Sequence, residues 1–137
     1  MTETATTAPA IGQEWPEQGG VYMGVRLIDG VPHHIIMPGG PEFDLVDVAF
    51  DDIANAIRER GEMNGHSDWR GPEKEDGMLG YINVPHLFDK DDWYWTTSPY
   101  GSLYAWAVFF ESGGVDYWNR LNEFRGRPVR SIIASPL

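Results

Sequence analysis

The strongest strand signal in the chain is AWAVFFESGG, residues 105–114. Residues 105–111 are mostly apolar and aromatic and include neither Gly nor Pro, which is typical of a buried central strand. Residues 112–114 predict a turn, because glycine adopts positive φ without a Cβ penalty, and residues 115–119 return as the second strand of a hairpin. Residues 127–133 predict one more strand, with Pro128 at an edge or an irregular position. We therefore expect the last third of the chain to decide the fold and to carry the working surface.

The N-terminal half predicts a hairpin followed by two helices. Residues 21–28 and 32–37 have the pattern of strands on either side of an Asp29-Gly30 turn. Apolar residues then recur every three or four positions, which predicts an amphipathic helix over 48–60, with Asp47 as its N-cap and Gly61 as its end.

A short second helix is expected after Pro72, with a buried stripe and two weakening glycines. The stripe consists of Met78, Leu79 and Ile82, and the glycines are Gly77 and Gly80. Residues 64–72 and 85–93 predict connecting loops. This order of elements is that of an α+β domain.

Length and composition set limits on the class of protein. The 137 residues fit one domain, expected over 19–137, preceded by a flexible arm over 1–18 that lacks the features of a secretory signal. The chain has no cysteine, which excludes disulfides, thiolate nucleophiles and Cys-ligated zinc. It also has no run of eighteen apolar residues, so membrane insertion is not expected.

The formal net charge is −11, and it is unevenly distributed along the chain. Fourteen acidic and five basic residues lie between Glu42 and Asp92. Direct nucleic-acid binding is therefore not expected. The acidity serves solubility, or alternatively forms a surface aimed at a basic partner.

Catalytic and metal-binding patterns are weak in this sequence. His33 and His34 point to opposite faces of the predicted strand, and the acidic run beside His86 (Asp89, Asp91 and Asp92) lacks the spacing and central Gly of a calcium loop. The chain carries no Gly-x-Ser-x-Gly elbow and no phosphate loop. We expect no enzyme activity, no metal and no cofactor.

Arginines near the C-terminus are expected to form separate structural pairs with acidic residues rather than one anion site. Arg127 and Arg130 differ by an odd step, which places them on opposite faces of a strand. In the loop Asp68-Trp69-Arg70, Trp69 is expected in the core, and Asp68 and Arg70 are expected to tie the loop in place.

Aromatic residues in the last third exceed what a small core must hide. Trp95 and Trp106 are assigned to the core. Tyr117 and Trp118 are adjacent on a strand, so one ring must face outward; Trp118 shares its face with Asp116 and is expected at the surface. Tyr and Trp are common in recognition surfaces. The predicted ligand- or partner-binding residues are Tyr100, Tyr104, Tyr117, Trp118, Asn119, Arg120 and Asn122.

The ordered combination of several of these motifs resembles the Lcl C-terminal-domain family. The motifs are NGHSDWR (64–70), YWTTS (94–98), AWAVF (105–109), NEFR (122–125) and RPVRS (127–131), and the match spans roughly residues 19–133. The resemblance implies a C-type-lectin-like fold with an N-terminal hairpin, two helices and an antiparallel β region with long loops. This sequence departs from other proteins of that fold in two respects. It lacks the cysteines of the formylglycine-generating enzymes, and it lacks the calcium-binding motifs of the calcium-dependent lectins.

The resemblance implies a non-catalytic binding module encoded by a phage or prophage. Such a module would recognise a glycan or protein on the host surface or act as a tail accessory, in contact with other phage structural proteins, and would be virion-associated. Homo-oligomers are common among such proteins. The alternative is an intracellular inhibitor of a bacterial defence system, of the anti-CRISPR type, acting in the host cytoplasm through its acidic surface.

Overall fold

The predicted central strand lies in the interior of a five-stranded sheet. In the structure, a computed structural model that describes residues 7–134, β6 (Tyr104–Phe109) pairs with β5 (Trp93–Tyr100) and β7 (Gly114–Asn119). The sheet continues through β8 (Glu123–Gly126) to β4 (Leu45–Ala49), in the order β4-β8-β5-β6-β7. Its pairs are antiparallel apart from the single parallel bridge between β5 and β8.

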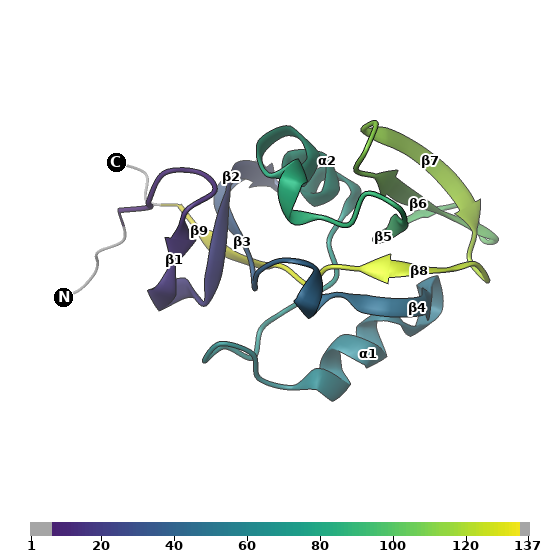
Figure 1. Ribbon diagram of the computed structural model, residues 1–137, viewed down its shortest axis with the longest axis horizontal. Coiled ribbons are helices and arrows are strands. Elements are labelled where there is room, and N and C mark those ends of the chain that lie inside the picture. The colour runs from purple at the N-terminus through teal and green to yellow at the C-terminus, as the bar shows by residue number, and fades with distance from the viewer. Residues whose placement is uncertain (1–6, 135–137) are drawn as a thin grey trace.

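A second, antiparallel sheet contains the predicted N-terminal hairpin. Its order is β1-β2-β3-β9, made of β1 (Glu14–Trp15), β2 (Gly20–Ile28), β3 (Val31–Met37) and β9 (Arg130–Ile133). The Asp29-Gly30 turn has positive φ at both residues, as the hairpin prediction requires. The last predicted strand is shorter than expected, because residues 127–129 cross from one sheet to the other before β9 begins (Figure 1).

The boundary expected between a flexible arm and the domain at residue 18 is not a boundary in the structure. Trp15 is 4% exposed, and Glu14 and Trp15 pair with β2. The backbone N–H of Gly12 donates to the carbonyl of Tyr22 at 2.8 Å. Residues 1–6 of the predicted arm lie outside the described residues. The described part of the arm therefore packs against the first sheet and contributes its strand β1.

The first predicted helix was placed too early in the chain. The α-helix α1 spans Ile53–Arg60, preceded by the single 3-10 turn η4 (Phe50–Asp52). Asp47, the expected N-cap, lies in β4 with a φ of 52° at a register irregularity of the β4–β8 pair. Leu45 and Val48 are buried on either side of this irregularity. The apolar repeat behind the prediction, which begins at Phe50, belongs to η4 and α1, so the prediction was wrong only in extending the helix back into β4.

The second helix, α2 (Lys74–Asn83), begins where it was predicted but buries a different face. Its buried residues are Asp76, Gly77 and Gly80. Of the predicted stripe, Met78 and Leu79 are half-buried, Leu79 packs against the buried group beneath α2, and Ile82 is 68% exposed. The helix approaches β6 so closely that a Cβ on Gly77 would lie 2.9 Å from Val108 Cγ2. The glycines, expected to weaken the helix, therefore allow this close contact. Glu73 and Asp76 close its N-terminus as a capping box.

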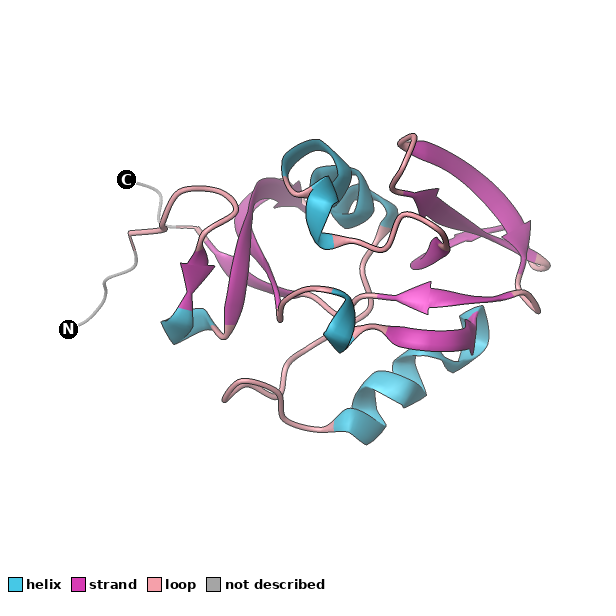
Figure 2. Ribbon diagram, in the orientation of Figure 1, coloured by secondary structure: helices cyan, strands magenta, loops and turns pink. Residues whose placement is uncertain are grey.

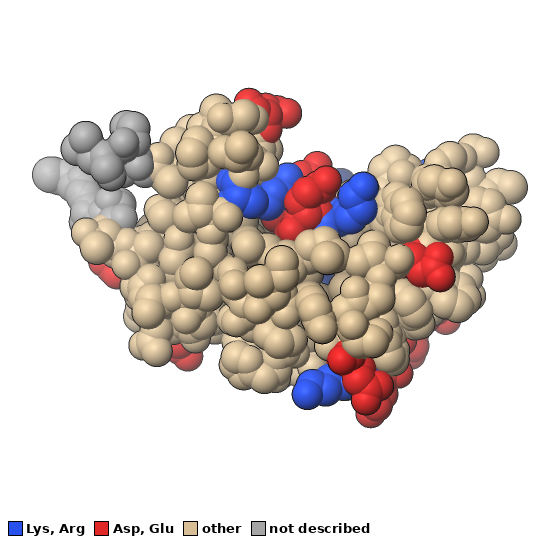
Figure 3. Space-filling view, turned by 90° about the horizontal axis from the view of Figure 1, so that it is seen from above, with Lys and Arg blue, Asp and Glu red and all other residues tan. Residues whose placement is uncertain are grey.

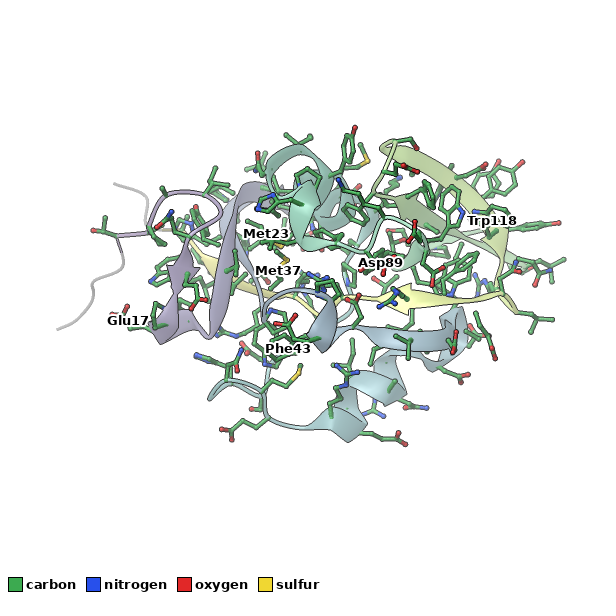
Figure 4. All side chains as sticks on the ribbon, viewed as in Figure 1. Glu17, Met23, Met37, Phe43, Asp89 and Trp118 are labelled. Carbon is green, nitrogen blue, oxygen red and sulfur yellow. The ribbon has the colours of Figure 1, made fainter. Side chains whose placement is uncertain are left out.

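In Figures 1 and 2, α2 lies above and α1 below the strands β8 and β4. Two groups of buried side chains fill the space between the sheets and helices. Trp95, fully buried as predicted, belongs to the group on the α1 side, together with Trp69. The other group lies beneath α2 and includes Met23 and Met37, which Figure 4 shows in the middle of the molecule. One face of β6 contacts the first group through Ala105 and Ala107, and Val108 on the other face contacts the second group.

Three short 3-10 turns complete the connections: η2 (Pro16–Gln18), η3 (Pro41–Phe43) and η5 (Pro85–Leu87). Each begins with a proline, whose fixed φ suits a first helical position. The described chain is thus a mixed α+β structure with two helices and mostly antiparallel strands. Neither α1 nor α2 is long and apolar enough to cross a bilayer.

Candidate binding surface

Three of the predicted binding residues form one exposed aromatic surface. We define the tyrosine face as Tyr100, Tyr104 and Tyr117, supported by Trp106. The three tyrosines are 46%, 39% and 44% exposed. The rings of Tyr100 and Tyr117 stack with centroids 4.4 Å apart, and Tyr104 meets Tyr117 edge-on at 5.5 Å. The strands β5, β6 and β7 thus bring together residues that lie up to seventeen positions apart in sequence.

Trp106 was predicted to lie in the core. In the structure it is half-buried and supports the tyrosine face instead. It pairs with Tyr117 across β6 and β7, so the two side chains share one face of the sheet. Its ring meets Tyr100 at 5.1 Å and Tyr117 at 5.7 Å, and it is half-buried. Val108 lies on the same face two residues on and is buried because α2 covers it. The helix begins too late to cover Trp106 in the same way.

An irregularity in β5 precedes Tyr100 and shapes one side of the tyrosine face. Between Trp95 and Pro99 the strand shifts register relative to β6. The Thr96 hydroxyl donates to the Trp106 carbonyl at 2.7 Å, and the Ser98 hydroxyl accepts the Lys74 N–H at 2.9 Å. Lys74 Nζ lies 5.4 Å from the centre of the Trp106 ring, a cation–π contact. The start of α2 therefore fixes one side of the face.

Arg120 fixes the opposite side from beneath. Its Nη2 and Nε donate to the carbonyls of Gly101 and Tyr104 at 2.6 and 3.2 Å, in the turn that joins two of the tyrosines. Its guanidinium lies 4.8 Å from the Phe50 ring and 3.6 Å from Asp51. Arg120, a predicted contact residue, thus holds this turn in place. Because the rings are held in place before binding, little ordering entropy is lost on association.

Trp118 faces the other side of the sheet, contrary to the expectation that it would be displayed. It pairs with Ala105 and packs against Trp93 at 5.3 Å and Phe124 at 5.7 Å. Figure 4 shows it at the end of the molecule near β7. The register is therefore the reverse of the predicted one, with Tyr117 outward. The apolar content of β6 alone did not reveal which face was the more open.

The two predicted asparagines serve the turn between β7 and β8. Asn119 Oδ1 accepts the N–H of Leu121 at 2.9 Å, and Asn122 Nδ2 donates to the Asn119 carbonyl at 3.0 Å. Sequence reasoning missed two residues beside the tyrosine face: Lys74, from a distant segment, and Leu103, which is 62% exposed. The adjacent Gly101-Ser102 turn was the available signal for Leu103.

The C-terminal arginines form ion pairs with acidic residues, as predicted, but two of them share one acid instead of forming separate pairs. Arg130 pairs with Asp68 at 2.5 Å and holds the pKa of that carboxyl below its usual range. Arg125 and Arg127, however, share the buried Asp44, at 3.2 and 2.6 Å. The prediction had placed Arg127 and Arg130 on opposite faces of one strand. Because β9 begins only at Arg130, Arg127 is not part of that strand.

Tyr94 completes this buried group, which we call the Asp44 cluster: Asp44, Tyr94, Arg125 and Arg127. The Tyr94 hydroxyl donates to Asp44 Oδ2 at 2.5 Å. Burial and this hydrogen bond to a carboxylate raise the pKa of Tyr94 above its ordinary value. Arg127 is 1% exposed and also donates to the carbonyls of Gly39 and Leu87. The cluster holds the two sheets and the η5 loop together.

The acidic loop 89–92 is held by the same cluster. Arg125 lies 3.4 Å from Asp89 and 3.7 Å from Asp92, and Figure 4 shows Asp89 beside β8. Burial raises the pKa of Asp92 above its ordinary value. Within residues 7–134, no group of three or more His, Asp or Glu is arranged to hold a metal ion.

The prediction that Trp69 lies in the core is confirmed. Its side chain is buried, and its indole N–H donates to the carbonyls of Met63 and His66.

The tyrosine face offers flat rings, hydroxyl groups and little charge. Seen from above, the end of the molecule that carries β6 and β7 is mostly free of charged side chains, whereas opposite charges lie together in the middle of that view (Figure 3). Such a surface suits a ligand with apolar faces and hydroxyl groups, since tyrosine contributes both contacts. The chain matches no family model, and no curated protein matches it significantly.

Proposed function

We propose that this protein is a non-catalytic binding module with a C-type-lectin-like fold that recognises a host-surface glycan through the tyrosine face. The proposal includes a phage or prophage origin and a place on the virion, as a receptor-binding or tail accessory protein. Its support is the exposed Tyr100–Tyr117 stack, together with the resemblance of the ordered motifs to the Lcl C-terminal-domain family.

The stacked tyrosines carry the proposal because their exposure has a structural cost. Large aromatic rings placed in water forgo the free energy of burial. The bulge at 96–98 and the Arg120 contacts hold these rings outward rather than letting them collapse. Rigid aromatic side chains of this kind dominate the binding energy at many interfaces.

The proposal is tested with the full-length chain and a panel of saccharides from the surface of host bacteria. Tyr117→Ala should weaken binding by about tenfold or more, as the loss of a central aromatic contact does. Ile82→Ala is the matched control: Ile82 is 68% exposed on α2, away from the tyrosine face, and its loss should leave binding unchanged. Wild-type protein that binds none of the saccharides, or binding that survives Tyr117→Ala, contradicts the proposal.

A second candidate function is an intracellular inhibitor of a bacterial defence system, of the anti-CRISPR type. The observation that favours it is a shallow groove between β4 and α1 with four acidic side chains on its walls: Asp47, Asp52, Glu59 and Glu123. Arg60, in the same groove, is committed to the carbonyls of Phe43 and Asp44. Such a groove suits a basic partner.

One pair of variants separates the two candidates. Asp52→Lys combined with Glu59→Lys should abolish capture of a basic defence-system protein and leave saccharide binding intact. Tyr117→Ala should have the opposite pattern. Pull-down from host lysate followed by identification of the captured protein reads the first activity, and the saccharide panel reads the second. A captured protein that is acidic, or that still binds the double variant, contradicts the inhibitor function.

A further inference from the structure

The loop after α1 ends in a two-residue turn that fastens it to the first sheet. Met63 and His66 exchange backbone hydrogen bonds at 2.9 and 3.0 Å around Asn64 and Gly65. Asn64 has a φ of 52° and Gly65 of 85°, the left-handed pair that Asn-Gly turns adopt. In Figure 1 this loop runs from α1 toward the end of the molecule that carries β1 and β2.

The side-chain amide of Asn64 connects this turn to the chain on either side of the first sheet's strands. Its Nδ2 donates to the carbonyl of Gly19 at 2.8 Å and to that of Pro38 at 3.1 Å. The His66 ring supports it through a contact of Nε2 with the Glu17 carbonyl at 3.0 Å. The carbonyls of Met63 and His66 in turn accept the indole N–H of the buried Trp69. The Asn64 amide, the His66 ring and the Asp68–Arg130 ion pair together hold the loop that positions a core tryptophan.

The same residue has the one Asn-Gly bond of the chain. Glycine leaves its own backbone nitrogen uncrowded, so that nitrogen can attack the side-chain carbonyl carbon of the preceding asparagine. The C–N bond to Nδ2 then breaks, ammonia leaves and a five-membered succinimide forms. Water opens the ring at either carbonyl and gives aspartate or isoaspartate. The step needs only water, and no electron transfer takes place.

We propose that Asn64 is a deamidation site, protected while its amide is bound to Gly19 and Pro38, and that its conversion permanently releases the loop 61–69. Cyclisation requires the leaving nitrogen to give up both hydrogen bonds, so the docked loop slows it. Asn64 is exposed, so water reaches it once the loop opens. After conversion, a carboxylate oxygen faces the two backbone carbonyl oxygens, and three acceptors without a donor repel one another. This inference does not depend on what the tyrosine face binds.

The first experiment measures protection. Full-length protein is incubated in mildly alkaline buffer, folded or in urea, and then digested with trypsin; the peptide 61–70 is followed by mass, and the released ammonia is assayed. Asn55, Asn83, Asn119 and Asn122, none followed by glycine, are internal controls. Asn64 should convert fastest in urea and at least about tenfold more slowly in folded protein, as two hydrogen bonds can provide. Equal rates in the two conditions, or no excess over the other asparagines, overturn the proposal.

The second experiment measures release. Asn64→Asp should increase hydrogen exchange over residues 63–69 and lower the melting temperature. Asn55→Asp adds the same charge on the exposed side of α1 and should do neither. Should Asn64→Asp fail to fold, wild-type protein converted in the first experiment is separated by charge and measured instead. Exchange over 63–69 that stays at the wild-type level after conversion overturns the proposal.

Discussion

At the scale of single residues, Tyr117 and Trp118 show how one strand divides its two faces. Tyr117 is 44% exposed, whereas Trp118 packs against Trp93 and Phe124. Adjacent residues on a strand must point to opposite faces, so the pair was bound to split. Which ring faced inward depended on packing against Trp93, 25 positions away in the sequence, and no local pattern contains that information.

Substitution of these two neighbours should therefore affect different properties. Trp118→Ala should lower the free energy of unfolding by about 2–3 kcal/mol, since it empties a partly enclosed site. Tyr117→Ala should cost about 1 kcal/mol or less and should chiefly reduce ligand binding. Denaturant melts of both variants test this, with Leu121→Ala, which is 82% exposed, as the control. A larger stability loss for Tyr117→Ala would contradict the observed register.

His34 should make the first sheet sensitive to mild acid. Its Nδ1 lies 2.7 Å from the Tyr22 hydroxyl, and the Trp15 ring meets its imidazole edge-on. Burial lowers the pKa of His34 in the folded protein below its ordinary value. The unfolded chain therefore binds the proton more readily, so stability is full above the ordinary pKa, about 6.5, and falls as pH drops through it.

The measurement is the melting temperature as a function of pH. His34→Gln should flatten the decline that begins near the ordinary histidine pKa, whereas His33→Gln should leave it in place. The decline at lower pH should remain in both variants, because the lowered pKa of Asp68 makes its ion pair with Arg130 disappear only there. A wild-type decline that persists unchanged in His34→Gln would assign the effect to another group.

At the scale of elements, the sequence predicted which segments form strands and helices better than it predicted which face of each element is buried. The β2–β3 hairpin, the β6–β7 hairpin and the start of α2 were predicted correctly, because turn glycines and helix caps are local signals. The first helix was extended back into β4, since Asp47 was assigned as an N-cap whereas it lies at an irregularity of the strand. The buried face of α2 was wrong, because hydrophobicity ranks isoleucine above glycine while close packing against β6 favours the smaller residue.

Gly77→Ala tests the close packing of α2 on β6. On an isolated helix this change gains about 1 kcal/mol. Here the added methyl would lie 2.9 Å from Val108 Cγ2, and overpacking costs about 1–3 kcal/mol. We expect a net loss of about 1 kcal/mol in the free energy of unfolding. In a double-mutant cycle, Val108→Ala should relieve part of that loss. A stabilised Gly77→Ala variant would show that the helix can move away from the sheet.

At the scale of the whole molecule, much of the acidity is structural. Of the acidic segment between Glu42 and Asp92, Asp44 and Asp76 are buried, and Asp68, Asp89 and Asp92 pair with arginines from the C-terminal part of the chain. The charge count correctly indicated that the two halves differ. It did not indicate that they neutralise each other across the fold, because the pairs span up to 83 positions. The exposed acids lie near α1 and β4 and also on α2 and in the loop before β5, where Glu75 and Asp91 are exposed.

The last prediction concerns the Asp44 cluster, which joins both sheets. Asp44→Asn keeps the shape of the side chain but leaves Arg127, 1% exposed, without its carboxylate. Breaking a buried ion pair in this way typically costs about 3–5 kcal/mol. Asp47→Asn is the matched control, since it removes the same charge from an exposed position and should change stability by less than about 0.5 kcal/mol.

Because Arg127 contacts Gly39 beyond β3, Leu87 in η5 and Asp44 before β4, the loss should reach both groups of buried side chains at once. Tryptophan fluorescence and backbone circular dichroism should therefore shift together to lower denaturant in Asp44→Asn, as one cooperative transition. Asp44→Asn combined with Arg127→Met should lose less than the sum of the two single variants, since no charge is then left unpaired at that contact. Separate fluorescence and dichroism transitions in Asp44→Asn, or a midpoint equal to that of Asp47→Asn, would show that the two sheets are held together by their apolar contacts alone.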